Sequence, residues 1–314
     1  MIISFHCLCF YTHRWWILGG LYVSTYDKIA SFLDTIDLPM FFFISGYLFC
    51  HLYINNGKYR SIKSFIIAKS KRLLIPYVLW GFFLIITMPS LHKWQNLLTG
   101  ISHLWFLLVL FEIFALVIPC TNWLCTKDTS KKFLCSILIA YFFFLLYQAI
   151  STHHAFLCIQ TTLYYMPFFL FGMYCARFRP FQNIALSKIV IILLLLILGL
   201  TYYILFITMP FFINFIIVQL FGITITVCLF LLFNKICFHS RFYHIISHLD
   251  RLSMGIYIFN QITINIFISS YDIVNFLNIN YIIGPFVIWV IGFIFPLIIS
   301  YFFNKTKYLK WTIG

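Results

Sequence analysis

The chain has 314 residues, of which 63% are hydrophobic and only 9% are charged, and its mean hydropathy is +1.00. Soluble globular domains carry about 25% charged residues, so this composition excludes an ordinary water-soluble fold. The formal net charge of +14 could suit a nucleic-acid partner, but the basic residues flank apolar runs instead of forming one basic domain. Anionic lipid headgroups and membrane topology explain the charge better, and no nucleic-acid partner is expected.

Nine apolar runs follow one another along the chain, at lengths near the roughly 20 residues that a helix needs to cross a bilayer. They lie at about 31–54, 73–91, 103–120, 133–151, 162–176, 189–208, 211–233, 254–270 and 282–303. No fixed-period repeat, low-complexity tract or flexible linker separates them. The pattern predicts an all-α, polytopic integral membrane helical bundle that forms one domain over residues 1–314.

A further span is expected at the N-terminus. Residues 1–11 are apolar but supply about half of the length needed to cross, and Arg14, Trp15 and Trp16 are typical of an outer interfacial boundary. We therefore expect about ten transmembrane helices, the first of which is truncated or begins upstream of Met1. No basic n-region or small-residue cleavage site marks a signal peptide, so this segment is expected to be retained.

The basic residues predict the orientation of the bundle. Of the 21 Lys and Arg residues, 18 lie in every second gap between spans, and only Arg14, Lys28 and Lys93 lie in the others. Loops rich in Lys and Arg face the cytoplasm in most membrane proteins. The C-terminus is therefore expected to be cytoplasmic.

The ten cysteines form no CxxC pair and no Cys/His cluster at zinc spacing. Most lie in or beside apolar runs, where cysteine packs as a small polarisable side chain, so no metal is expected. Cys7 and Cys9 adjoin His6, which leaves an accessory thiol role open.

Ionisable groups inside apolar runs are candidates for function, because each costs about 2.5–3.5 kcal/mol to insert at the centre of a span. The candidates are His6, Asp34, Asp37, His103, Glu112 and the basic cluster at residues 69–72. His103 and Glu112 are separated by about 13 Å along a helix, so they cannot form an acid–base pair by themselves.

Five segments occur in an order and at a spacing that resemble one family. They are residues 37–49 (DLPMFFFISGYLF), 69–77 (KSKRLLIPY), 103–107 (HLWFL), 165–172 (YMPFFLFG) and 253–261 (SMGIYIFNQ). Each segment alone is weak, since Phe-rich helices with Pro and Gly are common in membranes. Together they resemble the acyltransferase family 3 of integral membrane proteins over nearly the whole chain.

The resemblance implies an O-acyltransferase that moves an acyl group, usually acetyl, from cytoplasmic acetyl-CoA to a hydroxyl of a cell-surface carbohydrate, exopolysaccharide or glycolipid. The bacterial inner membrane is the expected location. A histidine in the first helix is essential in that family, and His6 occupies its place. The arginine that relatives carry earlier on that helix would lie before Met1.

His6 also suits this role on physical grounds. An imidazole has an unperturbed pKa of about 6.5, and its neutral form, which burial favours, keeps one ring nitrogen able to take a proton from an acceptor hydroxyl. The alternative is a structural histidine that hydrogen-bonds to a neighbouring helix.

The basic cluster is the candidate donor site. Lys69 and Arg72 are spaced i, i+3, which places them on one face of an α-helix, and both can bind the phosphates of coenzyme A. Relatives usually carry arginine at both positions, so Lys69 keeps the charge but loses the bidentate fork. Basic residues at the end of a span also serve topology alone.

Further residues are candidates for binding the acceptor or lining the acyl path. Asp37 can orient His6 or bind sugar hydroxyls, whereas Ser45 with Gly46 suits close helix packing better than acylation, because no Gly-x-Ser-x-Gly turn surrounds it. A sugar ring can stack on any of four aromatic residues, namely Trp15, Trp16, Trp105 and Tyr165. The complete set of predicted substrate-binding residues is Asp37, Ser45, His103, Trp105, Glu112 and Asn260.

Two other functions stay open. A transporter or flippase of lipid-linked sugars is also polytopic with buried polar groups, but such proteins commonly contain internal repeats, and none is recognisable here. An inactive acyltransferase-like scaffold is the second alternative.

Overall fold

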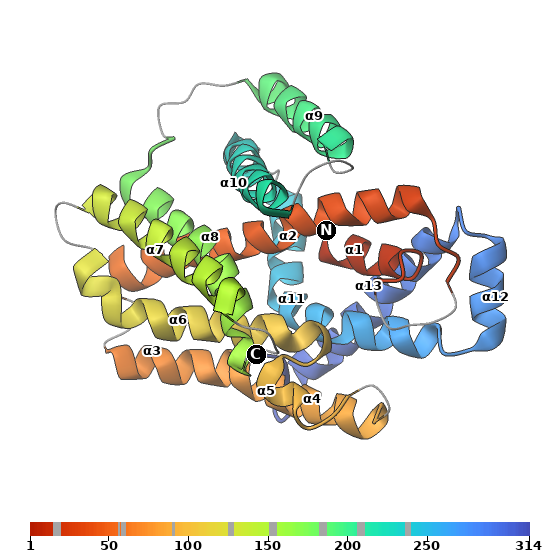
Figure 1. Cartoon of the computed structure of the whole chain (residues 1–314). Helices are drawn as coiled ribbons and strands as arrows, with labels where there is room; N and C mark the ends of the chain where they lie inside the picture. Colours follow the sequence, from red (N-terminus) through yellow and green to blue (C-terminus); the bar gives the residue numbers. More distant parts are fainter. Residues whose placement is uncertain are drawn as a thin grey trace. The chain divides into compact units, whose positions relative to one another are not determined.

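The computed structural model describes residues 1–14, 20–55, 57, 61–89, 92–124, 129–150, 156–181, 187–205, 211–235 and 240–314. Every regular element within these residues is helical (Figure 1). Five residues that bear on the predicted topology, namely Trp15, Trp16, Lys58, Arg60 and Lys127, lie outside the described part of the chain.

The chain forms two compact units that alternate along the sequence. Unit 1 comprises Met1–Pro39 and Ile184–Lys307, and unit 2 comprises Met40–Asn183 and Tyr308–Gly314. Helix α2 (Ser24–Phe49) belongs to both units and contains Pro39 at the division. The prediction of one membrane domain stays a prediction.

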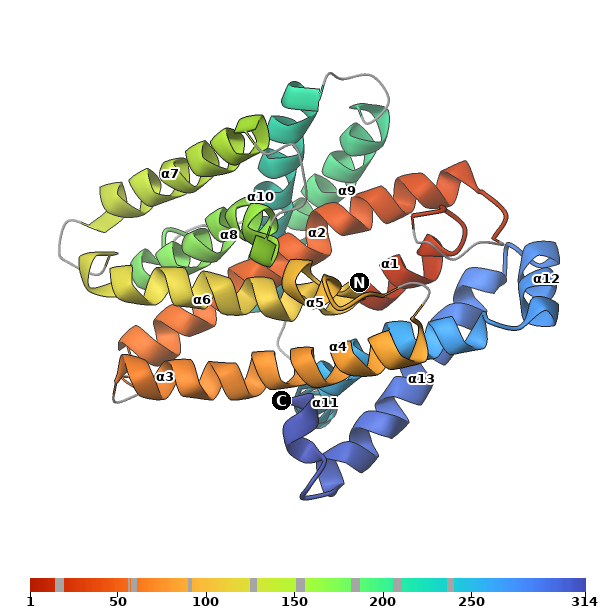
Figure 2. The ribbon, with the colours of Figure 1, turned by 60° about the horizontal axis from the view of Figure 1, so that its bottom comes forward.

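Unit 1 contains the N-terminal helix, the first part of α2 and the last five α-helices of the chain. In it, α1 packs against α11 and α13, and α11 lies along α13 (Figures 1 and 2). Besides the first part of α2, its helices are α1 (Ile2–Cys9), α9 (Lys188–Leu205), α10 (Phe211–Lys235), α11 (Ser240–Phe267), α12 (Tyr271–Ile279) and α13 (Gly284–Lys305).

Unit 2 is built around α6, which contacts α8, and around α7, which lies alongside α8 (Figure 2). After the end of α2, its α-helices are α3 (Ile62–Lys69), α4 (Ile75–Thr87), α5 (Asn96–Thr99), α6 (Trp105–Leu124), α7 (Thr129–Ile150) and α8 (Ile159–Phe178). Its shorter elements are two π-helical turns, η1 (Cys50–Asn55) and η2 (Ser70–Leu74), and the 3₁₀ turns η3 (Ser102–Leu104), η4 (Phe156–Cys158) and η5 (Lys310–Ile313).

Each of the nine apolar runs coincides over most of its length with a helix, so the helical membrane bundle is confirmed. Six described segments are long and apolar enough to cross a membrane, and the bent pair Ile246–Phe267 with Tyr271–Ile279 would make a seventh. The predicted count of about ten is not confirmed. Helix α1 has 8 residues, and the apolar part of α9, Lys188–Gly199, is also shorter than a span.

The helical segment that contains the predicted run at 73–91 begins earlier than predicted. Ser61 caps α3 through a capping box in which its hydroxyl accepts from the Ser64 backbone N–H at 3.2 Å. From there α3, η2 and α4 form one continuous rod, orange in Figure 2, over Ile62–Thr87. The basic cluster therefore lies within the helical rod instead of at its end.

Helices α2 and α8 cross closely inside unit 2. A Cβ atom on Gly46 would overlap the backbone carbonyl oxygen of Phe169, so only glycine permits this approach. The interpretation of Gly46 as a packing residue is thereby confirmed. Ser45 beside it is half-buried, and within the described residues no base hydrogen-bonds to its hydroxyl.

Candidate active-site residues

His6 is a buried residue of α1 whose ring lies within hydrogen-bond distance of a side chain on α11. Its Nδ1 lies 2.6 Å from Oδ1 of Asn260, and the two side chains are 7% and 1% exposed. The two residues are 254 positions apart in the sequence. The structure thus brings the predicted catalytic residue together with Asn260, which was predicted to bind substrate or to line the acyl path.

The amide nitrogen of Asn260 is also hydrogen-bonded. Its Nδ2 donates to the backbone carbonyl of Gly292 on α13 at 2.6 Å. A Cβ on Gly292 would come within 2.9 Å of that nitrogen, so the glycine makes room for the contact. Three helices of unit 1 therefore meet in the chain of contacts from His6 through Asn260 to Gly292.

A small apolar core anchors α1 at its C-terminal end. Tyr11 donates from its hydroxyl to the Leu277 carbonyl at 3.0 Å, and Cys7 and Phe10 pack against residues of α11 and α13. Cys7 and Cys9 are each 1% exposed. This burial matches the packing role that the sequence predicts for the two cysteines.

Asp37 also lies in unit 1 and is buried. Its Oδ1 accepts from the Leu38 backbone N–H at 2.8 Å. Asp37 is close enough to Asp34 and Tyr257 for electrostatic interaction, and Asp34 is similarly close to Arg14. The hydrogen bond at Nδ1 of His6 goes to Asn260 and not to Asp37.

The two predicted phosphate ligands lie in unit 2 and have different surroundings. Lys69 is half-buried, with its Nζ 4.6 Å from the centre of the Phe114 ring and 5.3 Å from that of Phe65. Arg72 is exposed. The π-helical turn η2 follows Lys69, so the spacing i, i+3 does not give the common face that it gives in an α-helix.

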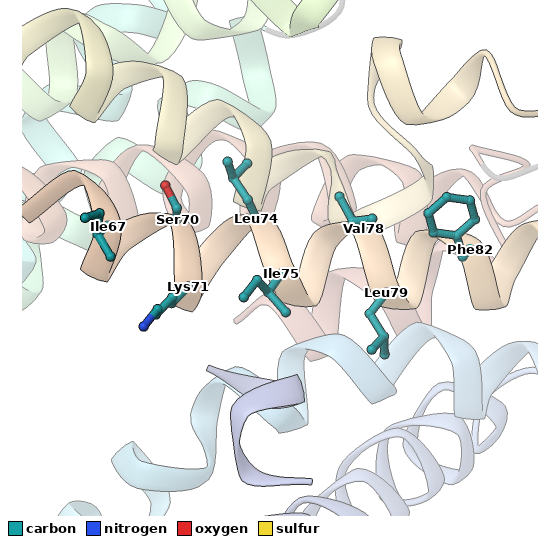
Figure 3. Close-up of a pocket in the computed structure, with 8 residues that line it drawn as sticks. All are labelled: Ile67, Ser70, Lys71, Leu74, Ile75, Val78, Leu79 and Phe82. Carbon is teal, nitrogen blue, oxygen red and sulfur yellow. The ribbon is translucent and has the colours of Figure 1, made fainter. Parts of the chain in front are cut away.

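A third basic residue of the cluster, Lys71, lines a groove. The groove has a volume of about 660 Å³, and Ser70 and Lys71 lie near one end of it, beside Ile67 (Figure 3). The remaining lining side chains are apolar and repeat at helical spacing along the rod: Ile67, Leu74, Ile75, Val78, Leu79 and Phe82. That spacing is the sequence signal for this face. The sequence prediction selected Lys69 and Arg72 for their i, i+3 spacing and did not select Lys71.

Glu112 pairs with a different helix and not with His103. The Thr162 hydroxyl on α8 donates to Oε2 of Glu112 at 2.5 Å, and no described residue hydrogen-bonds to the buried Oε1. His103 is buried in η3, 3.4 Å from the Ser102 hydroxyl. The structure therefore separates the two candidates, as their spacing predicts.

Trp105 begins α6 and belongs to an aromatic group. Its ring stacks with Tyr165 at 5.9 Å between centroids, and Tyr165 in turn stacks with Phe42 at 4.7 Å. Tyr165 is buried, whereas Trp105 keeps partial exposure. Of these three rings, Trp105 is the most exposed.

Comparison with protein families decides the relationship. The acyltransferase 3 family model, described as an acyltransferase domain, matches residues 1–305. The chain belongs to this family. The resemblance predicted from the five segments is thus confirmed, and this acyltransferase-family protein is an integral membrane protein. Comparisons with curated proteins and with solved structures give no match.

Proposed function

We propose that this acyltransferase-family protein transfers an acetyl group from cytoplasmic acetyl-CoA to a hydroxyl of a cell-surface or exopolysaccharide sugar. The observation that carries the proposal is His6, a buried imidazole with a fixed hydrogen-bond partner, within a chain whose family is defined by acyl transfer. The proposed location is the bacterial inner membrane.

The chemistry needs one base that later acts as an acid. His6 takes the proton of the acceptor hydroxyl while its oxygen attacks the thioester carbonyl carbon. The tetrahedral intermediate then expels the thiolate of coenzyme A as the C–S bond breaks. The imidazolium of His6 returns the proton to that sulfur, so the products are the O-acetyl sugar and free coenzyme A.

The donor is proposed to bind at the basic cluster of unit 2. Its phosphates would contact Lys71 together with Lys69 and Arg72, and its extended arm would lie along the apolar groove. The groove has a basic residue near one end and apolar side chains along its length. This chemistry suits a ligand with an anionic head and a long arm.

The acceptor is proposed to bind through hydroxyl contacts. The Asp37 carboxylate in unit 1 can accept hydrogen bonds from sugar hydroxyls, and a carbohydrate or glycolipid with several such groups is the class that suits it.

Orientation follows from the basic loops, which favour a cytoplasmic C-terminus. A reporter that is active only in the cytoplasm, fused after Gly314, tests this directly. Activity of a periplasm-specific reporter at the same position would reverse the proposed orientation.

Two assays on one preparation separate the candidate functions. Purified protein in vesicles is given acetyl-CoA with a labelled acetyl group and a lipid-linked sugar acceptor. Label in the sugar supports the transferase, movement of unmodified lipid-linked sugar across the bilayer supports a flippase, and neither supports an inactive scaffold. The broken helix α11–α12, bent by 94°, is a feature that transporters contain in pairs, and the described residues provide no second such pair.

A further inference from the structure

We infer that Asn260 is a positioning residue that holds His6 in a single tautomer, with the proton on Nδ1 and the basic lone pair on Nε2. This inference rests on the proposed function for its consequence, namely that Nε2 is the atom that accepts the acceptor's proton. The tautomer itself is a property of the resting protein.

The orientation of the Asn260 amide follows from its second contact. The backbone carbonyl of Gly292 can only accept a hydrogen bond, and it lies 2.6 Å from the Asn260 amide. An amide oxygen at that position would set two acceptors against each other in a buried site. The NH₂ group must therefore face Gly292, which leaves the Asn260 carbonyl oxygen facing His6.

The tautomer of His6 then follows from the same reasoning. The Asn260 oxygen has no proton to give, so the 2.6 Å contact is a hydrogen bond only if Nδ1 of His6 is the donor. In a neutral imidazole with its proton on Nδ1, Nε2 carries the lone pair. The arrangement has the logic of a nucleophile–base–orienter set, in which the third group selects the tautomer of the histidine.

Packing around the amide makes the arrangement rigid. Asn260 is 1% exposed, and the absence of a side chain at Gly292 lets α11 and α13 approach closely enough for both hydrogen bonds. A rotation of the amide would lose both bonds at once. The geometry is therefore set in the folded protein before any substrate binds.

The direct test is the ¹⁵N NMR spectrum of protein labelled at histidine. The His6 resonances are assigned by their loss in His6→Gln. We expect Nδ1 to resonate as a protonated nitrogen and Nε2 as an unprotonated one. The opposite pattern in the wild-type protein would overturn the inference, whether or not the protein transfers acetyl groups.

Variants test the consequence for catalysis. Asn260→Ala removes the acceptor, and we expect kcat to fall about 10- to 100-fold with little change in KM, a loss typical of residues that orient a functional group. Asn260→Asp keeps an oxygen acceptor toward Nδ1, so its NMR tautomer is expected to match wild type and its kcat to exceed that of Asn260→Ala.

The matched control is Asn265→Ala, because Asn265 lies on the same helix and is also buried. No described residue hydrogen-bonds to either of its amide atoms. We expect its kcat to stay within about twofold of wild type. Equal losses in Asn260→Ala and Asn265→Ala, or an unchanged kcat in Asn260→Ala, would contradict a positioning role. A wild-type protein with the expected tautomer but no acetyl transfer would instead refute the proposed function.

Discussion

Gly172 of α8 lies against the backbone carbonyl of Phe43 on α2 so closely that a Cβ on Gly172 would overlap the carbonyl oxygen. Together with the contact of Gly46 against Phe169, this makes the crossing of α2 and α8 a reciprocal glycine contact. Small residues at such crossings let helices in lipid gain van der Waals contact, since lipid provides no hydrophobic drive to associate.

Gly172→Ala is therefore expected to push α2 and α8 apart and to destabilise unit 2 by about 1–3 kcal/mol, the usual cost of overpacking. Thermal unfolding of the purified protein in detergent measures it. Gly199→Ala is the control, because among the described residues a Cβ there would meet only the Phe32 ring, at an ordinary 3.5 Å. The control should be neutral or slightly stabilising. Equal melting temperatures for both variants would refute the claim that α2 and α8 cross too closely for a Cβ at Gly172.

Thr162→Val tests the hydrogen bond to Glu112. The substitution removes the donor while keeping the shape, so Oε2 of Glu112 loses its partner beside an Oε1 that has none among the described residues. The expected loss is about 1–3 kcal/mol of folding stability. Thr162→Ser keeps the hydroxyl and should retain most of the stability. A Val variant as stable as the Ser variant would show that the bond contributes little.

Asn265→Leu is expected to stabilise unit 1. The Asn265 amide is buried, and both of its polar atoms lack a hydrogen-bond partner among the described residues. Replacing an unsatisfied amide with an apolar side chain of similar size relieves about 1–3 kcal/mol. A higher melting temperature with unchanged acetyl transfer is the predicted outcome. A lower melting temperature would indicate that the amide has a partner that stabilises the fold.

Lys71→Gln tests the donor site. If Lys71 contacts the phosphates of coenzyme A, KM for acetyl-CoA should rise about tenfold, equivalent to about 1.4 kcal/mol, with kcat little changed. Lys63→Gln removes an exposed charge from the same rod outside the groove and should leave KM unchanged. If KM rises in Lys69→Gln and Arg72→Gln but not in Lys71→Gln, the phosphates bind away from the groove.

Hydropathy alone locates the helices because burial in lipid demands long apolar runs, and each of the nine runs is helical. Hydropathy does not locate elements whose bounds depend on other physical features. The start of α3 depends on the Ser61 cap, and the π-helical turn η2 lies among basic residues that a hydropathy window rejects. Helix α12 has 9 residues, too few to register as a span.

The candidate site, like the fold, is predictable from the sequence only in part. His6 is identifiable because the family motifs point to it and because a histidine in an apolar run is costly. Its partner is not identifiable, since Asn260 is one of several polar residues on α11 and lies 254 positions away. Only the folded backbone, with Gly292 opposite, selects Asn260 over its neighbour Gln261.

The role of His6 as general base is tested by acetyl transfer from labelled acetyl-CoA to a sugar acceptor, measured for wild-type protein, His6→Ala and the control His248→Ala. His248 lies on α11 and has no role in the proposed chemistry. We expect kcat to fall at least about 100-fold in His6→Ala, the contribution of a general base, and to stay near wild type in His248→Ala. Undiminished transfer by His6→Ala would contradict this role.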